Sequence, residues 1–235
     1  MEKVKNEIIQ YKNEKSLLKK VPLYAPAGQS TQMIVGASGE SDAEIMYTSA
    51  FFYKSFNLKR VYYSGYVPIS QDNRLPAIGT PVPFIRENRL YQTDWLLRFY
   101  GFDVRELLNT EHPNLESDID PKLSWALRNL DQFPVNINKA DMRMLLRVPG
   151  LGVKSVHKII AARKYRKLNW ENLKLIGASL NRAKYFITCD SRTFERKDRT
   201  AAQLKGLIIN GSKSKFRNEL NTQLNLFDHQ NFQPT

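Results

Sequence analysis

The chain has 235 residues, 42% of them hydrophobic, and a formal net charge of +13, so it is long enough to bury the core of one large domain or two small ones. No stretch approaches the roughly 18 uninterrupted apolar residues of a membrane helix, and the charged start of the chain is unlike a signal peptide, so we expect a cytoplasmic protein without a membrane partner. The single cysteine, Cys189, excludes an internal disulfide and a self-sufficient zinc-finger or iron–sulfur site, because such sites need several thiolates or a dense Cys/His cluster.

The amino-terminal part is predicted to form a helix followed by a strand–helix–strand unit. Residues 1–20 have the spacing of a basic amphipathic helix that stops before Pro22, with apolar positions at Val4, Ile8, Ile9, Leu17 and Leu18. Residues 31–36 are a short apolar run leading into a glycine turn, and residues 41–56 have an acidic first turn and helical apolar spacing. Residues 59–67 are rich in aromatic and β-branched side chains, so we expect them to pair in parallel with the first strand.

The middle of the chain is predicted to alternate loops and helices. Prolines and a glycine make residues 68–83 irregular, residues 89–100 form a helix ended by Gly101, and residues 110–121 are an acidic connector. Residues 123–189 are predicted to be entirely helical with short breaks. The apolar content falls beyond about Lys205, and residues 218–235 are polar enough to be disordered.

The positive charge concentrates around two short helices joined by a glycine-rich turn. Residues 139–217 hold 20 basic and 5 acidic residues, a balance of +15, whereas the rest of the chain holds 16 and 18, a balance of −2. The first helix is predicted to begin at Asn138 as its N-cap, with the carboxylate of Asp141 three positions later. It breaks at residues 148–152, where Gly150 and Gly152 permit positive φ and leave the backbone unobstructed, and a second helix follows.

This turn has the chemistry of a phosphate site. The amides of the turn are left free at a helix amino end, where partial positive charge and unpaired N–H groups can receive a phosphate oxygen, and nearby basic side chains can contact neighbouring phosphates. The predicted DNA-binding residues are therefore Pro149, Gly150, Leu151, Gly152, Val153, Lys154, Lys158, Arg163 and Lys164.

Residues 135–164 resemble the helix-hairpin-helix DNA-binding family, in which Pro149-Gly150-Leu151-Gly152 is the hairpin. A degenerate second copy follows at residues 173–183, where Ala178-Ser179 departs from the glycine-rich form and is compatible with a purely supporting role. The resemblance implies backbone contacts to duplex DNA that read little sequence. Without the resemblance, the same residues would also fit an ordinary helical turn on a solvated basic face. RNA is an alternative ligand to DNA, because backbone amides that bind a phosphate do not distinguish ribose from deoxyribose.

Residues 33–40 resemble the glycine-x-isoleucine-x-glycine-x-x-glutamate stretch of radical S-adenosylmethionine barrels, although Gln32 replaces the first glycine. Together with the runs at residues 24–32, 66–69, 79–81 and 89–102 and the hairpins, it resembles DNA modification or repair radical S-adenosylmethionine proteins over about residues 20–190. The resemblance implies S-adenosylmethionine contacts from Met33, Ile34, Gly36, Glu40, Tyr66, Val67 and Pro68. The same segment also has an explanation without a cofactor. Residues 33–36 fit a buried parallel strand that ends in a glycine turn, and Glu40 fits a carboxylate placed at a helix start, where the helix dipole favours it.

One departure from that family bears on the chemistry. Its members carry a cysteine triplet in a front half of the barrel, and this chain has neither the triplet nor that half. Cys189 alone cannot hold a [4Fe-4S] cluster, so no cofactor is self-sufficient here. S-adenosylmethionine and the cluster are expected only if a missing amino-terminal half or a partner subunit completes the barrel, whose open strand edges would favour such a partner.

The segment Gln223-Leu224-Asn225-Leu226-Phe227 lies in an otherwise polar terminus. It resembles the short peptide with which bacterial DNA-processing proteins bind the replication sliding clamp, and this resemblance implies clamp contacts from Gln223, Leu224, Leu226 and Phe227. Packing of these residues on the helical domain is the alternative.

The whole sequence therefore predicts an α/β plus all-α protein: a partial (β/α) barrel at residues 1–120, a tandem helix-hairpin-helix domain at 121–190, and a basic extension with a flexible tail at 191–235. The expected function is sequence-tolerant DNA binding in repair or modification, in association with the nucleoid. The alternatives are an active half-enzyme completed by an iron–sulfur subunit and a non-catalytic adaptor that links DNA to the sliding clamp.

Overall fold

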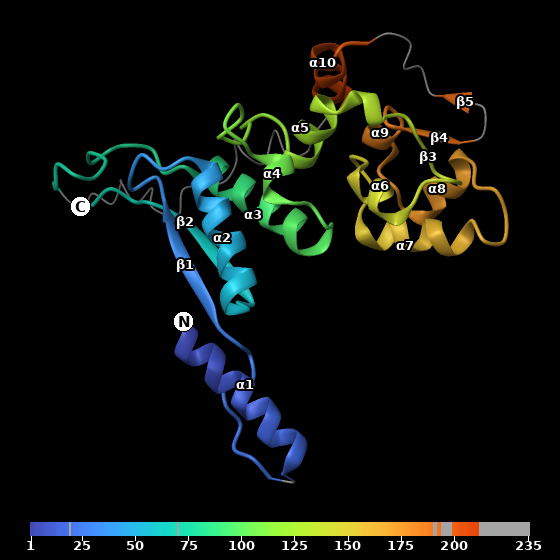
Figure 1. The fold of residues 1–235 in the computed structure, drawn as a ribbon. Coiled ribbons are helices and arrows are strands. Elements are labelled where there is room, and N and C mark those ends of the chain that lie inside the picture. The colour runs from blue at the N-terminus through green and yellow to red at the C-terminus, as the bar shows by residue number, and fades with distance from the viewer. Residues whose placement is uncertain (19, 70, 190–191, 194–198, 212–235) are drawn as a thin grey trace, which may run out of the picture.

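The computed structural model describes residues 1–18, 20–69, 71–189, 192–193 and 199–211. Figure 1 shows the strand–helix–strand unit of residues 30–65 toward one end of the molecule and the helices within residues 142–183 toward the other, with the helices within residues 84–128 between them. The buried apolar side chains of both parts belong to one core cluster.

The first unit is a parallel strand–helix–strand crossover, as predicted. β1 (Ser30–Val35) pairs in register with β2 (Arg60–Gly65), and α2 (Asp42–Phe56) connects them. Ser41 and Glu44 form a capping box at the start of α2, which satisfies two amides that the helix itself leaves unpaired. Alternate strand residues are buried beneath α2 and α3 (Phe84–Phe99), while the opposite face of the two strands is exposed. The larger barrel stays a prediction.

The first helix exists, but it does not pack as an amphipathic helix would. α1 (Glu2–Leu17) buries none of its side chains, and Leu17 is 84% exposed. Lys5 Nζ donates a hydrogen bond to the Ser55 carbonyl at the end of α2, and Figure 1 shows α1 beyond the end of the β1–α2–β2 unit. The apolar spacing therefore predicted the helix and not its burial.

A row of four aromatic side chains joins the two parts of the molecule. Phe102, Trp125, Phe133 and Phe186 pack edge to face, with ring centroids 5.4, 6.2 and 5.1 Å apart from one ring to the next. Phe102 lies just before α4 (Val104–Leu107) and Trp125 lies on α5 (Pro121–Arg128). Phe133 follows η1 (Leu130–Gln132), and Phe186 directly precedes β4 (Ile187–Cys189). We call them the aromatic row.

The prediction that residues 123–189 are entirely helical is wrong. β3 (Val135–Asn136) pairs in parallel with β4 (Ile187–Cys189), which pairs antiparallel with β5 (Arg192–Thr193). These strands are too short to show an alternating pattern, and β3 and β4 form only because the helices between them bring their ends together.

Five helices complete the described chain: α6 (Met142–Arg147), α7 (Val153–Ala162), α8 (Trp170–Ile176), α9 (Leu180–Ala183) and α10 (Ala201–Gly211). The last one lies in the basic extension, for which the sequence analysis predicted no helix: Leu204 and Ile208 are buried, and Lys205 pairs with Glu116 and Asp118 of the connector. In the described ranges, no helix combines the length and apolar character that crossing a membrane requires.

Candidate nucleic-acid interface

The hairpin between α6 and α7 is built on a tight turn. Asp141, and not Asn138, is the N-cap of α6, and its side chain accepts from Met144 N at 2.7 Å. The Asn138 amide instead bonds both backbone groups of Leu168, which fixes the loop that follows α7. After α6, Leu151 N donates to the Val148 carbonyl at 3.2 Å, a β-turn with proline second and glycine third.

The two hairpin glycines serve different purposes. Gly150 has φ +87, and a Cβ placed on it would lie 2.6 Å from Ser179 O and 3.1 Å from Ala183 N. Gly152 has φ −91, so the expected positive φ at this position is wrong, and a Cβ there would meet only Tyr100 Oη, at 3.7 Å. Gly150 is therefore required by the fold, whereas Gly152 keeps the start of α7 bare.

The start of α7 holds a group of unpaired donors. Gly152 is the N-cap of α7 and supplies no side-chain cap. Within the described ranges, the amides of Gly150, Gly152, Val153 and Lys154 have no hydrogen-bond acceptor. Unpaired amides at a helix amino end attract an anion through both their hydrogen-bond capacity and the helix dipole. The predicted free amides therefore lie together in the structure, at the end of a ten-residue helix.

The second hairpin has fewer donors to offer. Its turn residue Gly177 has φ +87, but Ser179 N donates to the Gly150 carbonyl at 3.1 Å, and Leu180 N donates to Ala178 O at 2.9 Å. The amides of Arg182 and Ala183 both donate to Ser179 O. The bond from Ser179 holds the second hairpin against the first, and the others occupy its amides within the hairpin itself, which favours the supporting role for this second copy.

Three basic side chains of the first hairpin are exposed, and one is hydrogen-bonded to the backbone. Lys154, Lys158 and Lys164 are exposed on or just after α7. Arg163 NH1 donates to the carbonyls of Ile137 and Ala140, so this guanidinium ties the end of α7 to the loop before α6. The structure thus shows a structural role for Arg163, and its phosphate contact stays a prediction.

Sequence reasoning missed three exposed basic residues of the same surface: His157, Arg166 and Lys167. No acidic residue occurs between Gly152 and Lys167, and the exposed residues of α7 recur at intervals of three and four. That spacing places them on one face of the helix and was available in the sequence.

Sequence reasoning also missed Lys122, which no local pattern connects to the hairpin. Its Nζ donates to the Leu151 carbonyl at 2.6 Å and lies 4.7 Å from the centroid of the Tyr100 ring. Burial lowers the pKa of Lys122 to about 7, although the charge of Asp120 acts in the opposite direction. Lys122 therefore anchors the turn to α5 from behind.

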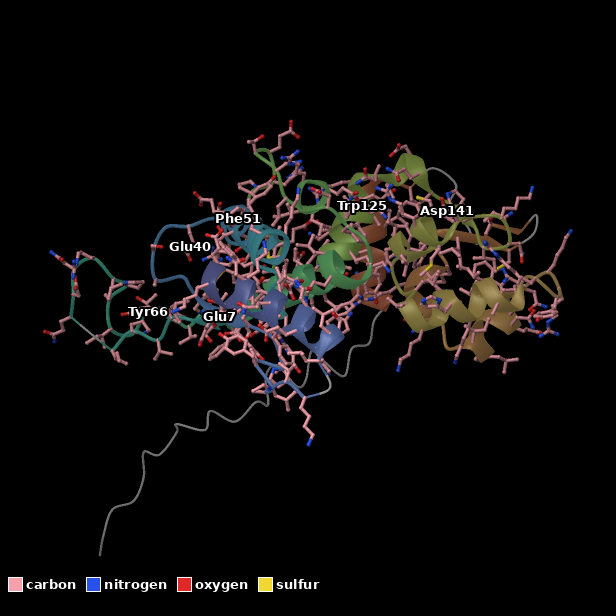
Figure 2. The ribbon with its side chains drawn as sticks, turned by 60° about the horizontal axis from the view of Figure 1, so that its bottom comes forward. Glu7, Glu40, Phe51, Tyr66, Trp125 and Asp141 are labelled. Atoms are coloured by element: carbon pink, nitrogen blue, oxygen red, sulfur yellow. The ribbon has the colours of Figure 1, made fainter. Side chains whose placement is uncertain are left out.

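The residues expected at S-adenosylmethionine gather at the carboxyl ends of β1 and β2. Tyr66 N donates to Val35 O at 2.8 Å, while Ile34 and Val67 are 51% and 57% exposed. Gly36 turns the chain with φ +80, and Met33 and Pro68 are half-buried. Figure 2 shows Glu40 and Tyr66 on one side of Trp125 and Asp141, at the start of α6, on the other.

Glu40 is engaged within its own loop. Its carboxylate accepts from the amides of Gly36 and Ser38 at 2.7 and 3.2 Å and faces Arg86 NH1 at 3.5 Å. Burial raises the pKa of Glu40, but the hydrogen bonds from Ser38 and Gly36 and the charge of Arg86 together hold it below its usual value. This geometry explains Glu40 as the residue that organises the loop between β1 and α2.

An iron–sulfur cluster does not fit the residues present. Cys189 is buried on β4, and the described part of the chain has no group of three or more His, Cys, Asp or Glu side chains placed to hold a metal ion. The predicted clamp residues Gln223, Leu224, Leu226 and Phe227 lie outside the described residues, so that hypothesis stays a prediction from the sequence.

Comparison with known proteins finds similarity to one kind of DNA-processing subunit. No family model and no solved structure matches the chain. The Holliday junction branch migration complex subunit RuvA of Stutzerimonas stutzeri (strain A1501) is 29% identical over 121 residues, which cover 47% of this chain and 56% of that protein. RuvA of Pseudomonas aeruginosa (strain LESB58) gives the same values. RuvA of Tolumonas auensis is 27% identical over 108 residues, or 44% of this chain and 52% of that protein.

The chain thus spans about half the length of the curated relatives it matches. These matches are proteins whose names place them in a complex that acts on Holliday junctions. They give no support to the resemblance to radical S-adenosylmethionine enzymes.

Proposed function

We propose that this chain binds DNA through the hairpin between α6 and α7, with a backbone phosphate on the amides at the start of α7. The observation that carries the proposal is the set of four unpaired amides of Gly150, Gly152, Val153 and Lys154, which lie at a helix start and are followed by basic side chains. The similarity to RuvA subunits supports DNA as the polymer and makes branched DNA the first substrate to try.

The contacts available here are suited to a phosphate backbone and not to base edges. Amides and lysines recognise phosphate oxygens, which every sequence presents alike, so we expect binding that tolerates any sequence and weakens steeply with salt. On α6 the positive charge is largely engaged, because Glu106 pairs with both Arg143 and the buried Arg147. The phosphate contacts therefore belong to α7.

Fluorescence anisotropy with labelled four-way junctions, linear duplex, single-stranded DNA and RNA across a salt series tests the proposal. Gly152→Val should weaken DNA binding about tenfold, the equivalent of one lost charge-assisted contact, because its side chain would cover the amides without straining φ. Gly206→Ala on α10, where a Cβ meets nothing within 4 Å, is the matched control. Unchanged affinity of the folded Gly152→Val protein would contradict the proposal.

The same series separates ionic contacts from the amide site. Lys154→Gln and Lys158→Gln should each reduce the slope of log affinity against log salt by about one ion, equally for all DNA sequences. Lys12→Gln on α1 should leave the slope unchanged. Tighter binding to RNA than to any DNA would replace the proposal with the RNA alternative.

A second candidate rests on the carboxyl ends of β1 and β2, because ligands of parallel α/β sheets bind beyond that edge. Met33, Gly36 and Tyr66 lie near that edge, and in the described part of the chain the sheet has only β1 and β2, so the outer edge of each strand is open to a further strand. On this proposal a separate cysteine-bearing subunit completes the barrel and supplies the cluster, while these residues contact S-adenosylmethionine. Co-purification of the chain with such a subunit and an iron–sulfur absorption band tests it, and failure of the two chains to associate would reject it.

A further inference from the structure

A cavity of about 440 Å³ lies at the opposite end of α7 from the free amides. It is lined by Lys158, Ala161, Ala162, Tyr165, Arg166, Leu168, Asn172, Leu175 and Ile176, from the end of α7, the following loop and α8. We call it the Tyr165 pocket. Aliphatic side chains and one aromatic ring make most of its wall, and Lys158, Arg166 and Asn172 supply its polar part.

Two side chains of the pocket keep large apolar surfaces in water. Tyr165 is 89% exposed and Leu175 is 82% exposed, in a domain that otherwise buries its large aliphatic residues. Apolar surface kept in water in this way is typical of a binding site. The basic residues nearby, among them Lys164, Arg166 and Lys167, favour an anionic polymer over a neutral or basic partner.

The pocket is continuous with the proposed phosphate site. Lys154, Lys158 and Ala161 are spaced by four and three residues, so these exposed positions follow one face of α7, and Tyr165 lies in the turn directly after the helix. Ten helical residues rise about 15 Å, which corresponds to about four nucleotides along one strand at about 3.4 Å each. A strand with one phosphate on the amides therefore reaches the pocket within a few nucleotides.

An exposed aromatic ring in a basic setting can stack on a base, but the faces of bases in an intact duplex are covered by their neighbours. Only an unpaired or extruded base presents a face, and stacking on a protein ring is largely insensitive to its identity. The pocket therefore suits DNA that contains unpaired bases and would not contribute to binding of a continuous duplex.

We propose that the Tyr165 pocket receives an unpaired DNA base, stacked on Tyr165 against Leu175, from a strand whose backbone lies on the hairpin amides. This inference rests on the proposed DNA binding and names its substrate class: DNA with single-stranded character, such as tails, gaps or open junctions.

The experiment compares a duplex with the same duplex carrying a short single-stranded tail that contains the fluorescent base 2-aminopurine. The full-length wild-type chain should bind the tailed DNA about tenfold more tightly than the duplex, as one stacked base allows, and should change the 2-aminopurine fluorescence. Tyr165→Ser should abolish both effects and leave duplex affinity unchanged. Tyr165→Phe, which keeps the ring, should retain both, and Leu175→Gln should weaken them.

The outcomes separate this inference from the function beneath it. If the chain binds duplex in a salt-sensitive way with no preference for the tailed DNA, or if that preference survives Tyr165→Ser, base binding in the pocket is overturned and DNA binding by the hairpin stands. A wild-type chain that binds no DNA overturns both. Binding of an acidic peptide that Tyr165→Ser abolishes, with no 2-aminopurine response from the tailed DNA, would assign the pocket to a protein partner and also overturn the proposal.

Discussion

Lys122 is the most unusual side chain near the hairpin. It is buried, donates to the Leu151 carbonyl at 2.6 Å and has no carboxylate within ion-pair distance among the described residues. Burial disfavours the charged ammonium and so lowers its pKa from the ordinary 10.5 to about 7, despite the charge of Asp120. Its protonation is therefore coupled to folding.

The sign of that coupling gives a prediction. Between about pH 7 and 10.5 the folded chain holds fewer protons at Lys122 than the unfolded chain, so the contribution of Lys122 to stability is lowest below pH 7 and rises through this window. We expect the difference in urea midpoint, wild type minus Lys122→Met, to increase when the pH is raised from 7 to 9.5. Other titrating groups cancel in this difference, and a constant or decreasing difference would contradict the assignment.

At the scale of the elements, the contact between the two hairpins depends on the absence of a side chain at Gly150. The Gly150 carbonyl accepts from Ser179 N, and the space beside its Cα is filled by the backbone of Ser179 and Ala183. The pair Asp120 and Arg182, with 2.5 Å between Oδ2 and NH1, joins α9 to the start of α5 nearby. The hairpins therefore form one packed unit, from which the amides of α7 project.

A matched pair of alanine variants tests this division between the glycines. Gly150→Ala should lower the free energy of unfolding by about 1 to 3 kcal/mol, because it combines a positive φ with a backbone clash. Gly152→Ala should change stability by less than about 1 kcal/mol, because it has an ordinary φ and free space. Thermal and urea unfolding of both variants measures this, and equal losses would show that the two positions are equivalent.

At the scale of the molecule, the aromatic row makes the two parts share a core. Phe102 and Phe186 are 84 positions apart in the sequence, yet they are connected through the rings of Trp125 and Phe133. α5 packs against α3, α4 and α10. The connector before α5 is mostly exposed, but Leu115 N donates to Asp42 Oδ2 and Glu116 pairs with Lys205, so it is tied to the elements on both sides and does not act as a free linker.

Such a shared core predicts that the described chain unfolds in one step. Trp95 on α3 and Trp170 on α8 report on the two parts separately in single-tryptophan variants, in which Trp125 and the other of these two tryptophans are replaced by phenylalanine. We expect the urea midpoints from fluorescence of the two variants to agree with the midpoint from circular dichroism of the same protein. Midpoints that separate would show two independent domains, as the sequence boundary at residue 120 predicts.

Much of the local structure followed from patterns within short windows. The helix at residues 42–56, the parallel strands around it and the hairpin helices were predictable, because apolar periodicity, N-capping residues and glycine turns act over a few residues. The basic face of α7 was predictable for the same reason. Those signals also pointed to the start of α7 as a place for free amides, since a helix leaves its first donors without partners of its own.

The remaining features depend on neighbours that are distant in sequence. No window could show that Lys122 meets Leu151, that Arg163 binds carbonyls before α6, or that a Cβ on Gly150 would meet Ser179. The two-residue strand β3 and the docking of α10 were missed for the same reason, because each is stabilised by partners brought close only in the folded chain. The sequence by itself thus determined the helices, the charge and the candidate phosphate site. Only the tertiary structure decided which donors stay free and which apolar side chains stay uncovered, because both depend on what the rest of the chain packs against.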